Sequence, residues 1–350
     1  MTRVEKTSLV RDLAQKLGFD RVGITRPGPS PRAVYYRQWL ARGHAGSMAY
    51  LHRNPELREN PARLLAGARS AICVALNYRR QDPPTSGTAS TGRVAQYVRG
   101  YDYHRVLRAM LGDLVEQLRQ RLDEPFEQRV FVDTGPVLER ELAAAAGLGW
   151  IGKNTMLLHE RLGSYLFLGE VFTTLELEPD APATDHCGNC TRCLDACPTG
   201  AFLAPYQLDA SRCISYLTIE HRRHASEESH DQIGDWVFGC DICQQVCPYN
   251  RRAPLATHPE IIADLIPARL PLLDLLNLRT GDYRRLTNGT AATRASRNMW
   301  RRNAAIALGN VATLTEQEQR ALAKACEDDD PTVRHAARHV TASRLGHRGK

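Results

Sequence analysis

Eight of the ten cysteines of this 350-residue chain gather in one stretch, where their spacing is that of a metal-cluster site. A first run reads Cys-x2-Cys-x2-Cys-x3-Cys-Pro from Cys187 to Pro198, and a second reads Cys-x2-Cys-x3-Cys-Pro from Cys240 to Pro248. In bacterial ferredoxins three thiolates of the longer run bind one [4Fe-4S] cube, and the fourth binds a second cube. The residues therefore predict two such clusters.

The second run is one ligand short, because Val237 occupies the place of its first cysteine. Cys213 is the only nearby candidate to replace it. With the fourth ligand crossing over, four thiolates belong to each cluster: Cys187, Cys190, Cys193 and Cys247 to one, and Cys197, Cys213, Cys240 and Cys243 to the other. Zinc is the alternative, but zinc sites lack duplicated runs that end in Cys-Pro. Cys73 and Cys326 are interpreted as small apolar residues.

Because each run supplies a thiolate to the other run's cluster, the two clusters must lie close together, and such pairs pass single electrons. They rarely transform an organic substrate alone. The preceding residues must therefore supply the electron acceptor. Their alternating helical and strand-like patterns are typical of an α/β or α+β fold. Helical periodicity covers residues 8–17, 104–122 and 137–146, apolar strand-length runs cover 71–78, 129–133 and 165–173, and a Pro-, Ser-, Thr- and Gly-rich loop covers 82–92.

The segment Gly147-Leu-Gly149-Trp-Ile-Gly152 matches the G-x-G-x-x-G pattern of dinucleotide-binding proteins. That fingerprint needs a strand before it and a helix after it, whereas here an Ala-rich helical segment precedes it and Lys-Asn-Thr follows. Nicotinamide binding is therefore not expected. The glycines indicate a helix end or a close approach of the backbone to another group.

The net charge of +7 is unevenly distributed. From Arg279 to Lys350 there are 14 Lys and Arg residues against 7 acidic ones, so residues 1–278 are neutral. A basic segment on a neutral body predicts a polyanionic partner such as a nucleic acid, although it also serves solubility. No run approaches the ~18 apolar residues of a membrane span, and residues 1–13 lack the apolar region of a signal peptide. A cytoplasmic, non-membrane protein is expected.

The C-terminal part also repeats itself weakly. Arg302-Asn-Ala-Ala305 and Arg334-His-Ala-Ala337 share the pattern Arg-x-Ala-Ala at an offset of 32 residues. A period of this size with small residues on helices favours stacked helical hairpins of the HEAT kind. An unrelated helical cap is the alternative.

Segments outside the cysteine runs make the sequence similar to one family. Val-Asp133-Thr-Gly-Pro, residues 147–155, Tyr-Asp-Tyr-His104 and Cys213-Ile-Ser-Tyr together resemble the epoxyqueuosine reductases, which act on tRNA at the end of queuosine synthesis. The resemblance implies an α+β protein in three parts. These are an N-terminal α/β cobalamin-binding catalytic domain (1–180), a ferredoxin-like two-cluster domain (181–255), and a basic, all-α, HEAT-like tRNA-binding domain (256–350).

The implied reaction is a two-electron reduction at the tRNA wobble position. The epoxide on the cyclopentane ring of epoxyqueuosine becomes an alkene, and its oxygen leaves as water. Cobalamin fed by the clusters supplies the electrons, and a positioned acid must protonate the oxygen. Asp133, at a strand end before a Gly-Pro turn, resembles the family's proton donor, for which a raised pKa is expected. The alternative is a turn residue that accepts backbone N–H groups.

The resemblance also implies further binding residues. The cofactor-binding positions are Arg58, Tyr97, Asp133, Lys153, Asn154, Ser215 and Asp241. Lys153 and Asn154 have the alternative role of helix-end and cap residues. Arg222 matches a tRNA contact, with a solvated loop as the alternative, and the charge pattern adds Arg297, Arg301 and Arg302 as expected tRNA-binding residues.

Two other functions stay open at this point. A cobalamin-dependent reductive dehalogenase would share the cofactors, but it is expected to carry an export signal and has no use for a basic helical tail. An electron-transfer adaptor would carry the clusters without a substrate pocket of its own. In the favoured interpretation the partners are tRNA and an external electron donor that the sequence does not name, and the chain acts as a monomer.

Overall fold

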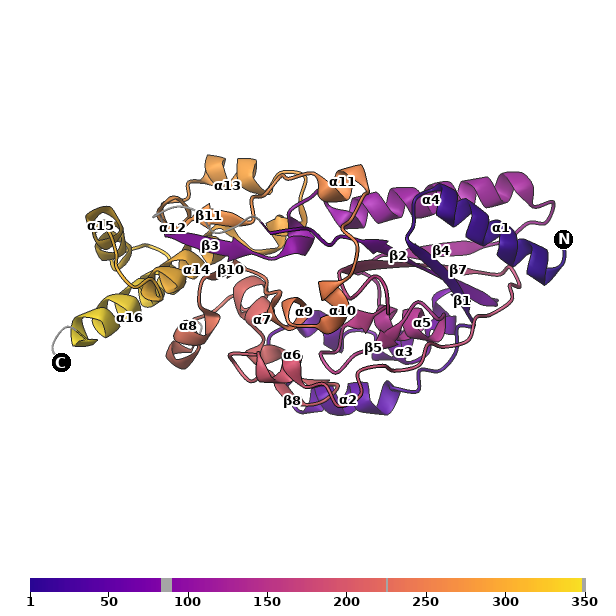
Figure 1. The fold of residues 1–350 in the computed structure, drawn as a ribbon, viewed down its shortest axis with the longest axis horizontal. Helices are drawn as coiled ribbons and strands as arrows, with labels where there is room; N and C mark the ends of the chain where they lie inside the picture. The colour runs from indigo at the N-terminus through magenta and orange to yellow at the C-terminus, as the bar shows by residue number, and fades with distance from the viewer. Residues whose placement is uncertain (83–89, 225, 348–350) are drawn as a thin grey trace.

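The computed structural model describes residues 1–82, 90–224 and 226–347, and the molecule is elongated with its termini at opposite ends (Figure 1). At the N-terminal end one sheet has the strand order β1 (Arg21–Thr25), β2 (Ser70–Asn77), β7 (Leu166–Thr173) and β4 (Gln128–Phe131). All pairings in this sheet are antiparallel. The expectation of an N-terminal α/β domain is therefore corrected to α+β, because a parallel sheet with crossover helices is not what these strands build.

Strand β2 is buried along its whole length because the sheet is covered on both faces. Successive side chains alternate between the faces. Ile72, Val74 and Leu76 pack into a core that includes α1 (Arg3–Lys16) and α4 (Tyr103–Arg121). Ala71, Cys73 and Ala75 pack into a second core that includes α5 (Glu139–Ala145). Cys73 is thus a small buried apolar residue, as its sequence context indicated.

The helices and strands expected in this region are confirmed, with ends that differ by a few residues. Helix α1 begins before the expected residue 8, because Thr2 and Glu5 form a capping box at its N-terminus. Of the expected loop at 82–92, residues 83–89 lie outside the described part of the chain, and Thr91–Val94 form strand β3.

The glycine segment at 147–152 follows helix α5 and enters a short hairpin of β5 (Trp150–Ile151) and β6 (Leu157–Leu158). The expectation that it is not a strand–turn–helix fingerprint is confirmed. Gly149 has a φ of +157°, and a Cβ there would lie 2.0 Å from the carbonyl oxygen of Leu158. Only glycine fits this close approach.

A separate core lies toward the C-terminus and is built from distant parts of the chain. Strand β3 pairs with β10 (Trp236–Phe238) and with β11 (Arg269–Pro271). Its apolar cluster runs from Val94 to Val340 and includes Trp300, which stacks on Phe238. The expected all-α part at 256–350 therefore contains a strand, and that strand pairs with residues of the expected first domain.

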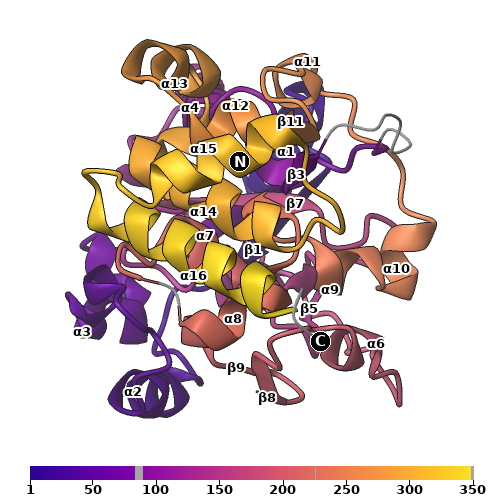
Figure 2. The ribbon, with the colours of Figure 1, turned by 90° about the vertical axis from the view of Figure 1, so that its left-hand side faces the viewer.

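The C-terminal helices are α12 (Leu272–Leu276), α13 (Thr280–Thr287), α14 (Arg297–Gly309), α15 (Glu316–Ala325) and α16 (Pro331–His347). The two Arg-x-Ala-Ala segments lie on α14 and α16, which pack against each other. Figure 2 shows these helices stacked side by side. This packing supports the idea of a helical repeat, and the HEAT-like assignment stays a prediction.

The cysteine segment lies between the two ends of the molecule (Figure 1). It contains α6 (Arg192–Asp195), α7 (Ile214–Ile219), α8 (Glu227–Ile233), α9 (Ile242–Gln245) and α10 (Pro248–Arg251). The remaining elements are α2 (Ala33–Ala41), α3 (Pro55–Glu59), α11 (Pro259–Ile262), β8 (Phe202–Ala204), β9 (Gln207–Leu208), and the short 3-10 turns η1 (Ala49–His52), η2 (Pro61–Leu64), η3 (Gln96–Val98), η4 (Ala210–Arg212) and η5 (Ala291–Arg294). Among the described residues, every helix is too short or too polar to cross a membrane.

Candidate active site

Asp133 lies just after β4, in a left-handed backbone conformation with a φ of +56°. Few non-glycine residues adopt this conformation, so the fold must hold it in place. Its Oδ2 atom lies 3.0 Å from the hydroxyl of Tyr103 and 3.0 Å from Nε2 of His104, at the start of α4. Its backbone amide donates to the carboxylate of Glu139 at the start of α5. The side chain is 56% exposed, so a substrate can reach it.

His104 connects Asp133 to a second carboxylate. Its Nδ1 lies 2.7 Å from Oδ1 of Asp102, which also accepts the backbone N–H of His104. Burial lowers the pKa of His104, but the hydrogen bonds to Asp102 and Asp133 and the charges of both outweigh it and raise the pKa to about 9. The imidazole is therefore protonated at neutral pH.

The same contacts act on Asp133 in the opposite direction. Burial raises the pKa of Asp133, but the hydrogen bonds from His104 and Tyr103 and the positive charges nearby outweigh it and hold the pKa below its usual value. The residues of the chain thus lower this pKa, whereas a raised value was expected beside a corrin face, because the sequence did not show that a protonated imidazole would face this carboxylate. At neutral pH the proton of the pair resides on His104.

Two further carboxyl groups lie close to Asp133. Glu170 projects from β7 opposite Phe131 of β4 and is 0% exposed. Burial raises the pKa of Glu139 to about 8, and the negative charge of Asp133 adds to this shift. Burial raises the pKa of Glu170 well above its ordinary value, and the negative charge of Glu139 adds to that shift. Because two such carboxyls do not both ionise, the pair retains a proton at neutral pH.

Aromatic and basic groups from the second core complete the surroundings of Asp133. Tyr97, which immediately follows β3 in η3, packs edge-on against Tyr103 with ring centroids 6.3 Å apart. Arg294 forms a bidentate ion pair with Glu220 at 2.6 and 2.8 Å, and its positive charge also lowers the pKa of Asp133. Segments from both ends of the molecule thus converge on one carboxylate.

Tyr50 lies next to Arg294 at the exposed side of this site. Its ring lies 5.2 Å from the guanidinium carbon of Arg294, within cation–π range. The negative charge of Asp133 is close enough to contribute to the raised pKa of Tyr50, in which burial is the largest cause.

One expected cofactor residue, Asn154, has a hydrogen-bond donor that no described residue uses. Asn154 is 3% exposed, and its Oδ1 accepts the backbone N–H of Met156 at 3.2 Å. Its Nδ2 has no hydrogen-bond partner among the described residues. A buried donor without an acceptor costs about 1–3 kcal/mol, so this amide fits a ligand that offers carbonyl oxygens. Ser215 is half-buried in the first turn of α7.

Three other expected cofactor residues are engaged within the protein. Arg58 is 8% exposed and donates to backbone carbonyls of the turn that precedes α3. The Lys153 ammonium donates to two carbonyls of the first cysteine loop, at 2.5 and 3.1 Å. Asp241 is 2% exposed and accepts the backbone N–H of Gln96 at 2.8 Å. These contacts position the loops around the site.

The eight cysteines of the two runs lie in two groups of four, as their mutual influence shows. Burial raises the pKa of five of these thiols, and the charges of nearby cysteines raise it further: Cys193 and Cys247 in one group, and Cys213, Cys240 and Cys243 in the other. One group is Cys187, Cys190, Cys193 and Cys247, and the other is Cys197, Cys213, Cys240 and Cys243. Cys193 also acts on Cys243, so the groups are adjacent. The crossed assignment of four thiolates to each cluster stays a prediction.

Each group has a hydrogen-bond donor directed at sulfur. The indole N–H of Trp150 lies 3.5 Å from Sγ of Cys187, and the backbone N–H of Ala201 lies 3.4 Å from Sγ of Cys197. Such donors stabilise negative charge on cluster thiolates and shift the reduction potential. In the described part of the chain, no three His, Cys, Asp or Glu side chains are arranged around a single metal ion.

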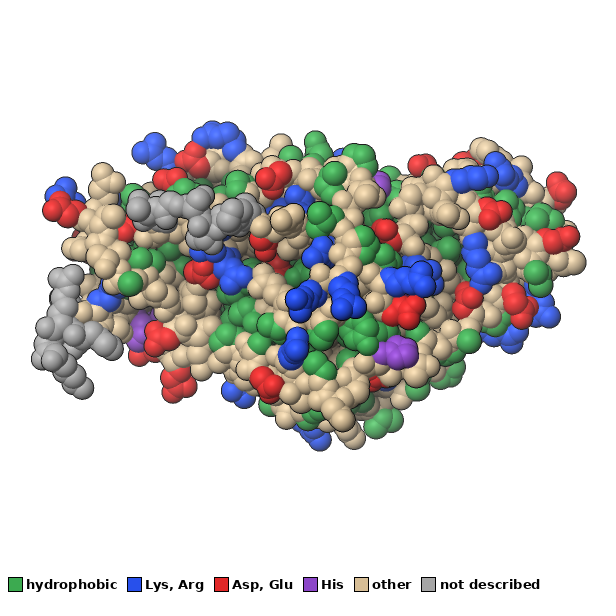
Figure 3. All heavy atoms as spheres, viewed as in Figure 1, with side chains coloured by type: hydrophobic (Ala, Val, Ile, Leu, Met, Phe, Trp, Pro, Cys, Tyr) green, Lys and Arg blue, Asp and Glu red, His purple; other side chains and the backbone are tan. Residues whose placement is uncertain are grey.

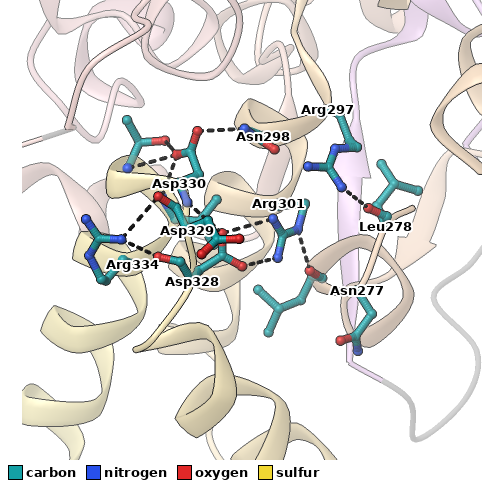
Figure 4. A network of polar contacts seen from close by, with 12 residues as sticks. Asn277, Leu278, Arg297, Asn298, Arg301, Asp328, Asp329, Asp330 and Arg334 are labelled. Carbon is teal, nitrogen blue, oxygen red and sulfur yellow. Dashed lines mark hydrogen bonds and ion pairs between the residues drawn. The ribbon is translucent and has the colours of Figure 1, made fainter. Parts of the chain in front are cut away.

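Two of the arginines expected to bind tRNA are not available for that role. Arg302 is 1% exposed and donates to the carbonyls of Leu217, His221 and Arg223 at 2.5 to 2.9 Å. Arg301 is ion-paired with Asp328, and its side chain is 14% exposed (Figure 4). The expectation is therefore wrong for Arg302 and Arg301, since charge counting cannot show which arginines the fold consumes internally.

Arg297 and Arg222 are more accessible. Arg297 is half-buried, with one contact to the carbonyl of Leu278 at 3.3 Å (Figure 4). Arg222 is exposed on the loop after α7, and its charge reaches Tyr283 of α13. Both stay predicted tRNA contacts.

Residues 58–134 match the family model described as epoxyqueuosine reductase QueG, and residues 186–250 match the 4Fe-4S double cluster binding domain. The chain is 42% identical over 331 residues to the epoxyqueuosine reductase of Xanthomonas campestris pv. campestris, covering 93% of this chain and 92% of that protein. This chain belongs to the epoxyqueuosine reductase family. The Escherichia coli K12 epoxyqueuosine reductase is 39% identical over 308 residues, which cover 86% of this chain and 80% of that one.

Solved structures of epoxyqueuosine reductases agree. A crystal structure of one with a tRNA-Tyr epoxyqueuosine-modified tRNA stem loop superposes with a TM-score of 0.87 at 32% identity, covering 95% of this chain and 88% of that chain. A Bacillus subtilis epoxyqueuosine reductase, with its catalytic aspartate loop swung out of the active site, superposes with a TM-score of 0.83 at 30% identity, covering 95% and 88%. Family membership decides for iron–sulfur clusters over zinc, and against the dehalogenase and the adaptor.

Sequence reasoning missed several residues of this epoxyqueuosine reductase site. Tyr103 and His104 stood in a segment used for the resemblance, but nothing in the sequence placed them on Asp133. Glu170 gave a usable signal, because a carboxylate inside an otherwise apolar strand is rarely left without a role. Arg294 gave none, since it is one of many arginines near the C-terminus.

Metal analysis tests the cysteine assignment. We expect about eight iron and eight sulfide per chain, from two four-iron clusters. In Cys213→Ser one cluster should be damaged and about half of the iron retained, while Cys73→Ser and Cys326→Ser should keep wild-type iron. Unchanged iron in Cys213→Ser would contradict the assignment of that residue.

Proposed function

We propose that this protein reduces epoxyqueuosine in the anticodon of tRNA to queuosine, with two [4Fe-4S] clusters and cobalamin as cofactors. The observation that carries the proposal is the hydrogen-bonded Asp133–His104 pair, which lies in a chain of this family beside a two-cluster module. Reduction converts the epoxide to an alkene, consumes two electrons and two protons, and releases water.

The protein residues supply the proton at the oxygen. An epoxide oxygen leaves readily only if it is protonated as the C–O bond breaks. Asp133 faces accessible space, while His104 holds the proton 3.0 Å behind it. Asp133 can therefore deliver a proton to the substrate as it receives one from His104, and Asp102 stabilises the charged imidazole before transfer. Glu139 accepts the backbone amide of Asp133, and the Glu139–Glu170 pair stores a further proton nearby.

Cobalamin, when bound, supplies the reducing chemistry at the carbon that loses oxygen. Asn154 fits this cofactor because its buried Nδ2 lacks an acceptor and a corrin carries amide carbonyls. Ser215, on α7, and Tyr97, on η3, are the other expected cofactor contacts. Arg58, Lys153 and Asp241 act through the loops that they hold. Cys197, Cys213, Cys240 and Cys243 would hold the cluster on the side of Tyr97, whose ring contacts Phe238 two residues before Cys240.

The tRNA substrate approaches from the side of Tyr50 and Arg294. The modified base must be turned out of the anticodon loop to reach Asp133. Arg222 and the exposed Arg284 of α13 provide positive charge for the phosphates on this side. This surface replaces the buried arginines of α14 as the site of electrostatic attraction.

Substitution of Asp133 tests the proton-transfer role. We expect Asp133→Ala to lower kcat by roughly 10²–10⁴, the range of a general acid, with iron and cobalt content near wild type. Asp133→Asn should be no better, because an amide cannot pass on a proton and no longer holds the charge on His104. If both variants turned over at the wild-type rate, Asp133 would be a turn residue only.

The pH profile tests where the proton is stored. The pKa of His104 is raised to about 9 in the folded protein, so its protonated form is fully present at neutral pH and is lost as the pH rises through that value. We expect kcat to be flat near neutrality and to fall as the pH passes about 9. In His104→Gln the activity should be low at neutral pH without this alkaline limb. If kcat of that variant still fell as the pH passed about 9, the fall would be due to the titration of a group other than His104.

Charge reversal tests the tRNA surface. We expect Arg222→Glu combined with Arg284→Glu to raise KM for tRNA about tenfold at physiological salt and to flatten its salt dependence, because fewer counterions are released. The kcat at saturating tRNA should stay within about twofold. Arg320→Glu, on the 80% exposed side chain of α15, is the matched control and should leave KM unchanged. Equal KM values in all three proteins would place the tRNA elsewhere.

A further inference from the structure

A basic cleft of about 830 Å³ lies on the face of the molecule that carries α6 and α10. Its walls are the segment after β2, the helix α6 and residues 245–251, and its lining includes the arginines Arg79, Arg80, Arg192 and Arg251. Figure 3 shows basic side chains gathered near the middle of this face, among apolar ones. The function proposed above leaves this cleft without a role.

The charge of the cleft is largely unneutralised. Asp82 and Asp195 are the acidic residues of its lining. Asp82 is already ion-paired with Arg99 at 2.6 Å, outside the lining. Arg80 is ion-paired with Asp264 at 3.6 Å. Among the described residues, Arg79, Arg192 and Arg251 form no ion pair with a carboxylate. The cleft therefore presents a positive surface to an acidic partner.

Cys247 connects this surface to the clusters. It belongs to the lining of the cleft and to the group of Cys187, Cys190 and Cys193. Cys193 of that group adjoins Cys243 of the other, which lies on the side of Tyr97 and the substrate. An electron that enters at the cleft thus meets the two clusters in order before it reaches the site of reduction.

The cleft lies on the opposite side from the approach of tRNA. In Figure 2, α2 and α3, which flank the turn of Tyr50, lie on one side, and α6 and α10 lie on the other. A partner in the cleft therefore leaves the surroundings of Asp133 open. Electrons can be delivered while tRNA is bound.

We propose that this cleft is the docking site of a small acidic one-electron carrier protein, which donates electrons to the cluster bound by Cys247. The inference rests on the proposed function, since two electrons are consumed per turnover. Each docking event oxidises the carrier by one electron and reduces one cluster by one electron, so two events supply a turnover. Charge attraction gives fast, salt-sensitive encounters, and a small interface allows quick release.

The test uses a flavodoxin as the acidic carrier and the cluster-loaded protein. Isothermal titration at low ionic strength measures binding of oxidised flavodoxin, and stopped-flow bleaching of the clusters measures reduction by its hydroquinone. We expect the triple variant R79E/R192E/R251E to weaken both at least tenfold and to flatten their salt dependence. Reduction by dithionite, KM for tRNA and iron content should stay within about twofold.

A matched variant separates position from net charge. R119E/R161E/R320E changes the charge equally at exposed sites outside the cleft and should behave like the wild type. Loss of flavodoxin binding in both triple variants would overturn the proposal, as would wild-type reduction that does not slow with salt. A raised KM for tRNA with unchanged flavodoxin kinetics would reassign the cleft to tRNA. Flavodoxin binding and cluster bleaching are measured without tRNA. They therefore test the docking site even if the proposed tRNA substrate is wrong.

Discussion

The arrangement of this protein depends on bringing eight thiols from distant segments into two groups of four. Cys247 must join three cysteines that precede it by more than fifty residues, and Cys213 must join a group on both sides of it in the sequence. Sulfur ligands at these separations meet only if the intervening chain folds back on itself. The helices α6 to α10 in this segment have four to seven residues each, and the two larger cores lie on either side of them.

The site of proton transfer is built by the same convergence. Asp133 comes from the N-terminal sheet, Tyr97 from η3 beside the second core, and Arg294 from the η5 turn before α14. Asp133 supplies a carboxylate in a constrained turn, Tyr97 supplies an aromatic ring beside it, and Arg294 supplies a positive charge. The proton rests on His104 rather than on Asp133, because the imidazole sits between two carboxylates and the aspartate receives two hydrogen bonds. Burial without these contacts would favour the neutral form of each group, with the proton on the carboxyl of Asp133 and not on the imidazole of His104.

The internal use of arginine shapes both surfaces. Arg302 and Arg301 tie the C-terminal helices to the loop after α7 and to the end of α15, and so cannot meet a polyanion. Arginines without an ion-paired carboxylate among the described residues give two positive surfaces. One lies around Arg222, and the other is the cleft of Arg192 and Arg251. Two anionic partners, a nucleic acid and an acidic carrier, can thus be served without competing for one surface.

The sequence by itself determined the clusters, the principal helices and strands of the first 180 residues, and the family, because ligand spacing and hydrophobic period are local properties of the chain. The spacing also predicts the crossed cysteine groups. Only the tertiary structure decided that the N-terminal sheet is antiparallel, that β11 joins β3, and which arginines are buried. It alone placed His104 against Asp133 and so reversed the expected pKa shift. Strand direction, burial and pKa depend on contacts between residues far apart in the chain, which no local pattern records.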